Sequence, residues 1–251
     1  MKPRQRQAQI ADLVENKGEA SVDYLAGVFA VSSETIRRDL SLLAETGVVQ
    51  KVHGGAKRSR LFAEGSFQER MSQNTAGKAV IAEKLTKLVE PGDTIFIDTG
   101  STTLACAHRL ASIKNLTVIT NCVRIAHVIG EGPGESQIYL IGGAYRTGNG
   151  QTVGPQAIEH IRSFQADHAV IAVAALDQNA GAMDAAIEEA HVARAMVDCS
   201  NSLIIVADAS KFERKAAYRV CELKEIDVLV SDQLPPPSFA AILEGVNVEV
   251  R

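Results

Sequence analysis

Seven short apolar runs, rich in β-branched residues, recur along the second part of this 251-residue chain and alternate with segments of helical character. The runs are Thr94–Asp98, Leu116–Thr120, Gln137–Ile141, His168–Ala175, Ser202–Ala207, Ile226–Val230 and Val246–Val250. The helical segments between them include Lys78–Val89, Leu104–Ala111 and Ile187–Cys199. Nearly continuous apolar strands that alternate with helices indicate a mostly parallel sheet covered on both faces. The sequence therefore predicts a large α/β domain over residues 78–251.

The composition fits a globular protein and excludes several other classes. Hydrophobic residues make up 46% of the chain, which is too many for a disordered or collagen-like protein. No apolar run approaches the roughly 20 residues of a membrane span, and no signal-peptide stretch follows the N-terminus. The cysteines lie far apart at positions 106, 122, 199 and 221, which is typical of buried thiols in a reducing compartment. We therefore expect a soluble cytoplasmic protein with no membrane partner.

The charge is distributed unevenly along the chain. Residues 1–60 carry ten Lys and Arg against seven Asp and Glu, a net charge of +3. The remaining residues carry 16 basic against 23 acidic side chains, a net charge of −7. A basic N-terminal segment on an otherwise acidic chain suggests that only the N-terminal part binds a polyanion.

Hydrophobic spacing in the first sixty residues predicts three short helices. They cover residues 4–16, Val22–Phe29 and Glu34–Thr46. Ser21 and Ser33 are suited to N-cap the second and third helices, and Gly47 ends the third. A strand over Val48–His53 is then expected to turn at Gly54 and form a wing. The predicted inward side chains are Ile10, Leu13, Val14, Val22, Leu25, Ala26, Phe29, Ile36, Leu40 and Leu43.

Three short helices with a sharp turn at Val31-Ser32 indicate a helix-turn-helix whose third helix enters the major groove of DNA. The candidate contacts to bases or phosphates from this helix are Ser32, Ser33, Thr35, Arg37 and Arg38. The basic residues of the wing, which are candidates for phosphate contacts, are Lys51, His53, Lys57 and Arg58. An alternative interpretation, in which Arg37 and Arg38 form an ordinary solvated pair, remains open at this stage.

Polar residues follow the first strand of the predicted sheet, where parallel sheets bind their ligands. The segment consists of Asp98, Thr99, Gly100, Ser101, Thr102 and Thr103 and leads into a helix. Hydroxyl and backbone N–H groups at a helix start favour an anion, most simply a phosphate. The segment lacks the Gly-Lys-Ser/Thr end of a Walker loop. An ordinary helix cap explains the same residues, so both interpretations stay open.

Other strand ends contribute polar groups to the same edge of the sheet. The candidates are Asn121, Gly142, Gly143, Arg146, Asp177, Asp208 and Lys211. A lysine suits a phosphate, and carboxylate and amide groups suit sugar hydroxyls. Each residue taken alone is more simply a loop residue that satisfies its own backbone. Their convergence on one edge favours a binding site.

The chain resembles the DeoR family of bacterial transcriptional regulators over nearly its whole length. The N-terminal signatures that carry the resemblance are Ser32–Leu40, Val52–Ala56 and Phe67–Arg70. The C-terminal signatures are Asp98–Thr103, Val118–Asn121, Gly142–Arg146, Val153–Pro155, Glu189–Val192 and Asp208–Phe212.

The resemblance implies a winged helix-turn-helix domain, which we place at residues 1–57, a linker at 58–77 and an effector-sensing α/β domain at 78–251. It also implies that the effector domain is similar in fold to ribose-5-phosphate isomerase. Glu189 joins the candidate effector-binding residues on this basis. The implied partners are operator DNA and a phosphorylated sugar or polyol.

Four alanines depart from the pattern of the family. Ala172, Ala174 and Ala175 stand where glycines are usual, and Ala193 stands where a lysine usually precedes the arginine. The missing lysine removes a potential partner for a phosphate or a carboxylate. Because of these departures, both the identity of the effector and the question of whether an effector binds stay open.

The sequence favours a DNA-binding regulator that represses a sugar or polyol catabolic operon. We expect a dimer or tetramer, because two operator half-sites need two DNA-binding domains. One alternative is a sugar-phosphate isomerase-like enzyme that carries a DNA-binding module, with Asp98, Asp177 and Glu189 as acids or bases. Another is a DNA-binding regulator with a degenerate effector pocket. No histidine lies at metal-ligand spacing and no nucleophile motif is present, so we expect no metal, cofactor or catalytic residue.

Overall fold

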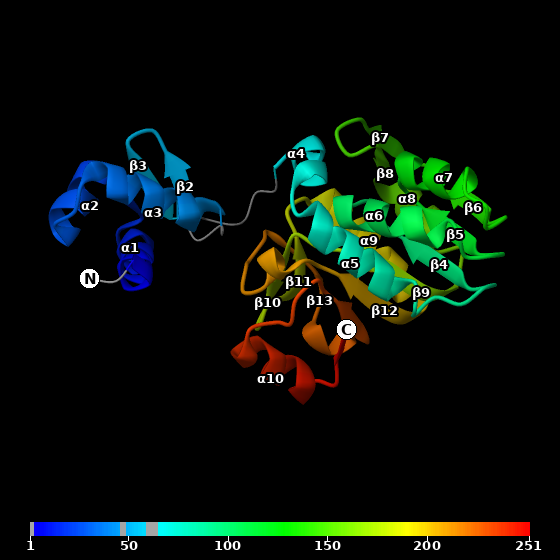
Figure 1. Cartoon of the computed structure of the whole chain (residues 1–251). Coiled ribbons are helices and arrows are strands. Elements are labelled where there is room, and N and C mark those ends of the chain that lie inside the picture. The colour runs from blue at the N-terminus through cyan, green and yellow to red at the C-terminus, as the bar shows by residue number, and fades with distance from the viewer. Residues whose placement is uncertain (1–2, 46–48, 59–64) are drawn as a thin grey trace. The chain divides into compact units, whose positions relative to one another are not determined.

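The computed structural model of the chain describes residues 3–45, 49–58 and 65–251. The chain divides between residues 62 and 63 into a smaller N-terminal unit and a larger C-terminal unit. Figure 1 labels the elements of both. The smaller unit has one hydrophobic cluster of its own, and the larger unit has two. The two units are therefore described one after the other.

In its described residues, the smaller unit contains three helices and a three-stranded antiparallel sheet. The helices are α1 (Pro3–Lys17), α2 (Val22–Phe29) and α3 (Ser33–Glu45), and the strands are β1 (Glu19–Ser21), β2 (Val49–Val52) and β3 (Gly55–Arg58). The strand order is β1-β3-β2. Ile10, Leu25, Ile36 and Leu40 are fully buried in its core, which confirms the predicted inward faces. The predicted helix end at Gly47 and strand start at Val48 lie outside the described residues.

Two local features of this unit differ from the prediction. Strand β1 was not predicted, because only one of its three residues is buried and no alternation is visible over so short a run. The cap of α3 is Ser32, whose Oγ accepts a hydrogen bond from the N–H of Thr35 at 3.2 Å. The predicted cap, Ser33, is instead the first residue of the helix. Adjacent serines offer the same side-chain chemistry, so the sequence does not distinguish them.

A seven-stranded parallel sheet forms the centre of the larger unit, with the strand order β15-β14-β12-β9-β4-β5-β6. The strands are β4 (Thr94–Ile97), β5 (Thr117–Thr120), β6 (Gln137–Leu140), β9 (Ala166–Ala172), β12 (Ser200–Val206), β14 (Val228–Val230) and β15 (Glu249–Val250). Each of the seven predicted apolar runs contributes one of these strands. The prediction of a mostly parallel sheet is confirmed.

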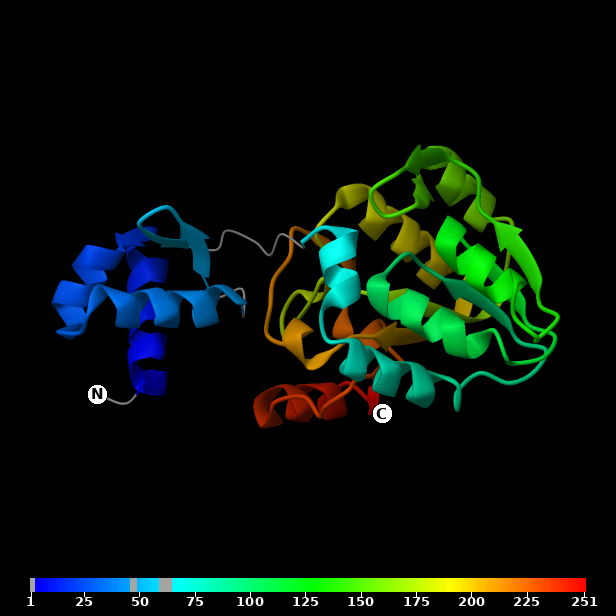
Figure 2. The same cartoon turned by 45° about the horizontal axis from the view of Figure 1, so that its top comes forward.

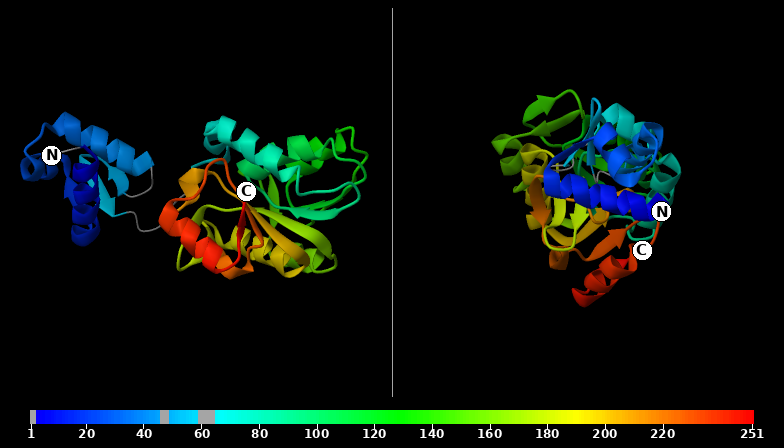
Figure 3. Two further views of the ribbon diagram at one scale, coloured as in Figure 1. Left: turned by 60° about the horizontal axis from the view of Figure 1, so that its bottom comes forward. Right: turned by 90° about the vertical axis from the view of Figure 1, so that its left-hand side faces the viewer.

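Helices cover both faces of the sheet because successive strand residues point to opposite sides. One layer consists of α5 (Thr75–Leu85), α6 (Ser101–Leu110) and α7 (Val123–Gly130), which lie side by side (Figure 2). The other consists of α8 (Pro155–Ile161), α9 (Ile187–Asp198) and α10 (Pro237–Gly245) (Figure 3, left). Within β4, Ile95 and Ile97 pack in the first layer, whereas Phe96 packs in the second.

Short antiparallel strands flank the carboxyl edge of the large sheet and were not predicted. Strands β7 (Ala144–Arg146) and β8 (Gln151–Val153) form a hairpin. Strands β10 (Ala175–Asp177), β11 (Gly181–Asp184) and β13 (Tyr218–Cys221) form a small sheet. Single-turn helices η1 (Ala209–Lys211) and η2 (Leu223–Glu225) complete the unit. These strands lack the continuous apolar runs that revealed the equally short strands of the large sheet.

Helix α4 (Phe67–Ser72) lies inside the segment 58–77, for which the sequence predicted no regular structure. A reciprocal capping box starts the helix, in which Ser66 and Glu69 each bond the backbone N–H of the other. Phe67 is only 5% exposed and packs in the cluster beneath α5 and α6. A six-residue helix with one buried side chain shows no hydrophobic period, which explains why this element was missed.

Candidate functional site

Helix α3 turns two arginines away from the core of the smaller unit. The side chains of Arg37 and Arg38 are 58% and 80% exposed, while Ile36 and Leu40 on the same helix are buried. Each guanidinium lies 3.7 Å from a carboxylate oxygen of Glu34. Exposed pairs of this kind contribute little to stability, at most about 1 kcal/mol. Either arginine can therefore exchange Glu34 for a phosphate or a base at small cost.

The start of α3 presents two hydroxyl groups together. The Oγ of Ser32 lies 2.9 Å from the Oγ1 of Thr35, in addition to capping the helix. The hydroxyl of Ser33 faces α2 instead and donates to the Oδ1 of Asp23 at 3.3 Å. Of the three hydroxyl residues predicted to contact DNA, Ser32 and Thr35 therefore lie together, whereas Ser33 bonds to another side chain of the protein.

The wing places a lysine beside the same helix. Lys51 of β2 is exposed, and its Nζ donates to the Oγ of Ser41 at 2.9 Å. The Ser41 hydroxyl in turn donates to the carbonyl of Arg37 at 2.8 Å. His53 is exposed in the turn between β2 and β3. Of the predicted wing cations, Lys51 thus contacts α3, and the side chain of Arg58 lies outside the described part of the chain.

At the carboxyl edge of the large sheet, Asp98 follows β4 and is buried. Its Oδ1 accepts a hydrogen bond from the N–H of Ala172 at 3.0 Å. Burial raises the pKa of this carboxyl well above its ordinary value, and the nearby carboxylates of Asp184 and Glu189 raise the pKa further. The bond from Ala172 and a bond with Thr103 oppose this rise. The carboxylates of Asp184 and Glu189 therefore lie near enough to Asp98 to disfavour its charged form.

Gly100 and the three hydroxyl residues after it form the start of α6. The helix begins at Ser101, earlier than the predicted Leu104, so Ser101, Thr102 and Thr103 occupy its first turn. A Cβ on Gly100 would lie 2.7 Å from the Cβ of Ala172 and 2.9 Å from the Oγ1 of Thr103. The glycine is therefore required for close packing against β9, while its φ of −165° is available to any residue.

Polar side chains from four segments join in a chain of hydrogen bonds at this edge. The Nδ2 of Asn121, which follows β5, donates to the Oε1 of Gln151 at 3.2 Å. The Nε2 of Gln151 donates to the Oε1 of Glu189 at 2.6 Å. The hydroxyl of Thr99 lies 3.4 Å from the Oδ1 of Asn121. The structure thus brings together Asn121 and Glu189, two residues predicted to bind an effector, and connects them to the segment that follows β4.

The remaining predicted residues lie around this centre or have other partners. Gly142 donates its N–H to the Nδ1 of His160 at 3.2 Å. Gly143 has a φ of +144°, and a Cβ there would lie 2.8 Å from the carbonyl of Val153. The guanidinium of Arg146 is exposed and forms two bonds to Glu188, at 2.7 and 3.0 Å. Lys211 is half-buried on η1, which follows β12, two strands from β4 in the sheet.

The alanines that depart from the family pattern occupy different environments. Ala172 is the close neighbour of Gly100, and the N–H of Ala174 donates to the carbonyl of Met183 at 2.9 Å. Ala175 is buried in the first position of β10. Ala193 is buried in the hydrophobic cluster beneath α9. An alanine suits this apolar position, which lies one turn from Glu189 on the same helix.

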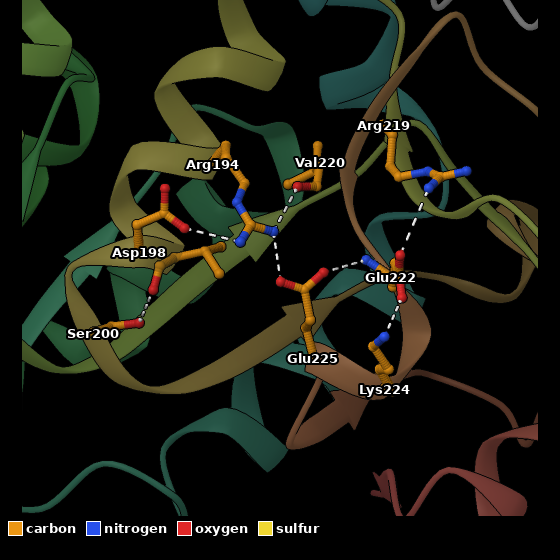
Figure 4. A network of polar contacts seen from close by, with 9 residues as sticks. Arg194, Asp198, Ser200, Arg219, Val220, Glu222, Lys224 and Glu225 are labelled. Carbon is orange, nitrogen blue, oxygen red and sulfur yellow. Dashed lines mark hydrogen bonds and ion pairs between the residues drawn. The ribbon is translucent and has the colours of Figure 1, made fainter.

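Arg194, which follows Ala193, belongs to a separate network (Figure 4). Its guanidinium bonds to Glu225 at 2.6 Å and to Asp198 at 2.9 Å, and it donates to the carbonyl of Val220 at 3.4 Å. These partners raise the pKa of Arg194 against the opposing effect of burial. The arginine therefore joins α9 to η2 and β13 and does not take the place of the missing lysine.

Of the three carboxylates considered for acid-base chemistry, Asp177 has a structural role. Its Oδ1 accepts hydrogen bonds from the N–H groups of Asn179 at 3.0 Å and Ala180 at 2.8 Å. It therefore holds the turn between β10 and β11. Asp98 and Glu189 share the strand-end cluster described above. No group of three or more His, Cys, Asp or Glu suited to a metal ion occurs among residues 3–45, 49–58 and 65–251.

Three residues of the site were not found by sequence reasoning. Gln151 and Asn149 both donate to Glu189, and Asp184 lies near Asp98. They lie in the small hairpin and the small antiparallel sheet, which the sequence did not reveal. The nearest signal is the family signature Val153–Pro155, which starts two residues after Gln151.

Two family models match this chain, one for each unit. The DeoR-like helix-turn-helix domain matches residues 6–60, and the DeoR C terminal sensor domain matches residues 73–233. The chain belongs to the DeoR family. The predicted resemblance is confirmed, and with it the fold class of an N-terminal winged helix-turn-helix followed by a larger α/β domain.

Several DeoR-family proteins align over nearly the whole chain. The transcriptional repressor AccR of Agrobacterium fabrum is 35% identical over 248 residues, which cover 98% of this chain and 94% of that protein. The transcriptional repressor CsqR of Escherichia coli is 31% identical over 245 residues, with 98% and 94% covered. The glycerol-3-phosphate regulon repressor of E. coli is 30% identical over 251 residues, with 100% and 99% covered.

The structure also resembles solved structures at low sequence identity. eIF2B beta from Chaetomium thermophilum has a TM-score of 0.47 and 14% identity, covering 89% of this chain and 64% of that chain. Ribose 5-phosphate isomerase A from Methanocaldococcus jannaschii has a TM-score of 0.39 and 14% identity, covering 54% and 53%. Within the part of the DeoR-family chain that the structure describes, no helix is long and apolar enough to cross a membrane.

Proposed function

We propose that this DeoR-family regulator represses a sugar or polyol catabolic operon and that a phosphorylated sugar or polyol controls its affinity for the operator. One observation supports this proposal above the others. A helix-turn-helix unit with two exposed arginines on its third helix is joined in one chain to a strand-end polar cluster. Three relatives aligned over 94% or more of their length are named repressors, and one of them is a glycerol-3-phosphate regulon repressor.

On the DNA side, we propose that α3 enters the major groove. Arg37 and Arg38 contact bases or phosphates, and the hydroxyls at the start of the helix contact the sugar-phosphate backbone of the DNA. Lys51 and His53 of the wing add phosphate contacts. A dimer or tetramer supplies two such helices to paired half-sites. Because a regulator must reach the DNA that it binds, we place the protein in the cytoplasm.

On the effector side, we propose that the phosphate lies at the first turn of α6. The N–H groups of a first helical turn have no carbonyl partners within the helix and attract anions. The hydroxyls of the sugar or polyol then reach the acidic and amide side chains of the cluster. The residues proposed to contact the effector are Asp98, Gly100, Ser101, Thr102, Thr103, Asn121, Gly142, Gly143, Arg146, Glu189 and Lys211.

Two measurements on the full chain test the two halves of this proposal. The first is selection of bound duplexes from a random DNA pool, which is expected to return a repeated half-site. The second is thermal unfolding with glycerol 3-phosphate, pentose 5-phosphates and hexose 6-phosphates, each compared with its unphosphorylated form and with inorganic phosphate. A ligand present at about 100 times its Kd stabilises the folded state by about 2.7 kcal/mol. For a chain of this size, that raises the Tm by about 5–10 °C.

The outcomes separate the interpretations. A shift with one phosphorylated compound and not with its free form or inorganic phosphate supports the proposed effector class. Sequence-specific DNA binding without any shift supports a regulator with a degenerate pocket. Failure to enrich any DNA sequence overturns the proposed function. Turnover of a sugar phosphate during the assay supports the enzyme interpretation instead.

A further inference from the structure

Helix α4 is the first described element of the larger unit, and the chain leads back from it to the helix-turn-helix unit. Several contacts hold it in place. The ring of Phe67 is buried, and the guanidinium of Arg124 lies 4.5 Å from its centroid. The Nζ of Lys78 donates to the carbonyls of Arg70 and Gln73, the latter at 2.8 Å. These contacts fix α4 against α5 and α7 within the larger unit.

One residue, Asn149 in the turn of the β7–β8 hairpin, contacts both α4 and the strand-end cluster. The Nη2 of Arg70 in α4 donates to the Oδ1 of Asn149 at 3.3 Å. The Nδ2 of Asn149 donates to the Oε1 of Glu189 at 2.6 Å. Arg124, which also covers Phe67, donates to the backbone carbonyl of Asn149 at 3.1 Å. The side chain of Asn149 thus joins the N-terminal helix of the larger unit to α9.

The amide of Asn149 suits both of these contacts. A guanidinium only donates hydrogen bonds and a carboxylate only accepts them. An asparagine offers an acceptor to Arg70 and a donor to Glu189 at the same time. An aspartate would place a second negative charge against Glu189, and an alanine would make neither bond. The same Oε1 of Glu189 also accepts from Gln151, so the two amides share one acceptor atom.

We propose that Asn149 is the residue that couples the strand-end site to α4 and so to DNA binding. Effector hydroxyls that bond to Glu189 compete with Asn149 for its carboxylate, loosen the hairpin turn and release Arg70. This inference rests on the proposed function, and it adds the route by which an occupied site changes operator affinity. A coupling of this kind is a free energy shared between two sites, so it is measurable as non-additivity between substitutions.

The test is a double-mutant cycle on the full chain. The measured quantity is the Kd for a fluorescently labelled DNA duplex, whose sequence the unmodified protein has selected from a random pool. The variants are Glu189→Gln, Asn149→Ala and the combination. We expect Glu189→Gln alone to change the Kd by fivefold or more, and by less than twofold when Asn149→Ala is already present. Matched controls are Glu159→Gln and Asn201→Ala, which alter exposed side chains of α8 and of the amino end of β12.

Hydrogen exchange provides a second readout that a merely structural role of Asn149 would not move. Glu189→Gln is expected to lower the protection of the amides in α4 only while Asn149 is present, with the Tm unchanged. If Asn149→Ala lowers the Tm, Arg70→Gln replaces it in the cycle and breaks the same path at its other end. Additive changes in Kd in both cycles overturn the coupling role while leaving the proposed function intact. Failure of the unmodified chain to select any duplex overturns both.

Discussion

The Nε of Arg6 lies 2.6 Å from the Oδ2 of Asp39, and this ion pair joins α1 to the helix that we propose to enter DNA. Both side chains are nearly buried, at 10% and 5% exposure. The Nε2 of Gln7 bonds to the other oxygen of Asp39 at 2.9 Å. Because Asp39 directly follows Arg37 and Arg38, the pair fixes the rotation of α3 and therefore the direction in which the two arginines point.

Replacing Arg6 with methionine is expected to destabilise the smaller unit. The substitution leaves the Asp39 carboxylate buried, with the amide of Gln7 as its remaining partner from α1. Breaking a buried ion pair costs about 3–5 kcal/mol. Hydrogen exchange of the full chain is the suitable measurement, because it reads the amides of α1 and α3 separately from those of the large sheet. Protection in α1 and α3 is expected to fall while protection in β4 and β9 is unchanged.

The matched comparison for this variant is Arg38→Met, which removes an exposed guanidinium from the same region. Arg38→Met is expected to weaken DNA binding without changing the protection of α1 or α3. Equal protection in Arg6→Met and the unmodified chain would show that the pair contributes nothing to this unit.

Arg37→Ala is expected to lower affinity for the selected duplex by about 10–100-fold if the arginine reads a base, because a good base contact contributes about 1–3 kcal/mol. The loss is expected to be larger on the selected duplex than on a scrambled one. Fluorescence anisotropy on both duplexes measures it, with the Tm as the check on folding. An unchanged Kd would mean that α3 is not the recognition helix.

Lys51→Ala is expected to act differently, because a lysine on a phosphate carries little sequence information. The loss should be similar for the selected and the scrambled duplex. The slope of log K against log salt should become shallower by about 1, since one fewer counterion is released. Titrations at several salt concentrations measure the slope. A loss confined to the selected duplex would assign Lys51 to base reading instead.

The parallel sheet was predictable because its strands are buried on both faces. The central residues of these runs, such as Ile95–Ile97 and Leu203–Ala207, are continuously apolar, and a strand buried on both faces needs that composition. Strand β1 was not predictable, because its pairing with the distant strand β3 decides it. Strands β7 and β8 pair with each other in a hairpin, but neither forms a continuous apolar run. The cap at Ser32 and the helix α4 depend on individual hydrogen bonds, which a hydrophobic pattern does not record.

The candidate site was predictable only where a residue directly follows a parallel strand. Asp98 and Asn121 were found in this way, and the structure brings both to the same edge of the sheet. Gln151 and Asn149 reach that edge because a hairpin folds back over it, and nothing in the local sequence indicates this. Glu189 was expected only from the family resemblance, since its position depends on where α9 begins.

Gly100→Ala is expected to destabilise the larger unit, because the added Cβ would lie 2.7 Å from the Cβ of Ala172. Overpacking of this kind costs about 1–3 kcal/mol, which lowers the Tm by several degrees. The companion variant Ala172→Gly removes the opposing methyl group. The double variant is therefore expected to recover part of the lost Tm. If the two effects are additive, the contact between positions 100 and 172 is not the cause.

Asp98→Asn is expected to stabilise the protein above neutral pH, because folding raises the pKa of Asp98, mainly through burial. The folded state then binds more protons than the unfolded state, whose pKa is about 3.9. The stability that this group contributes is therefore complete below about pH 3.9 and is lost as the pH rises through the folded pKa.

The asparagine variant keeps the oxygen that accepts from Ala172 but has no proton to lose at this position. Thermal unfolding from pH 5 to pH 8.5 is therefore expected to show a Tm advantage for Asp98→Asn over the unmodified chain that grows with pH. A one-unit rise in pKa corresponds to about 1.4 kcal/mol, or about 3–5 °C here. Glu131→Gln, which removes an exposed carboxylate, is the control and should show no such trend. A Tm difference that is constant with pH would mean that Asp98 ionises as readily in the folded protein as in the unfolded chain.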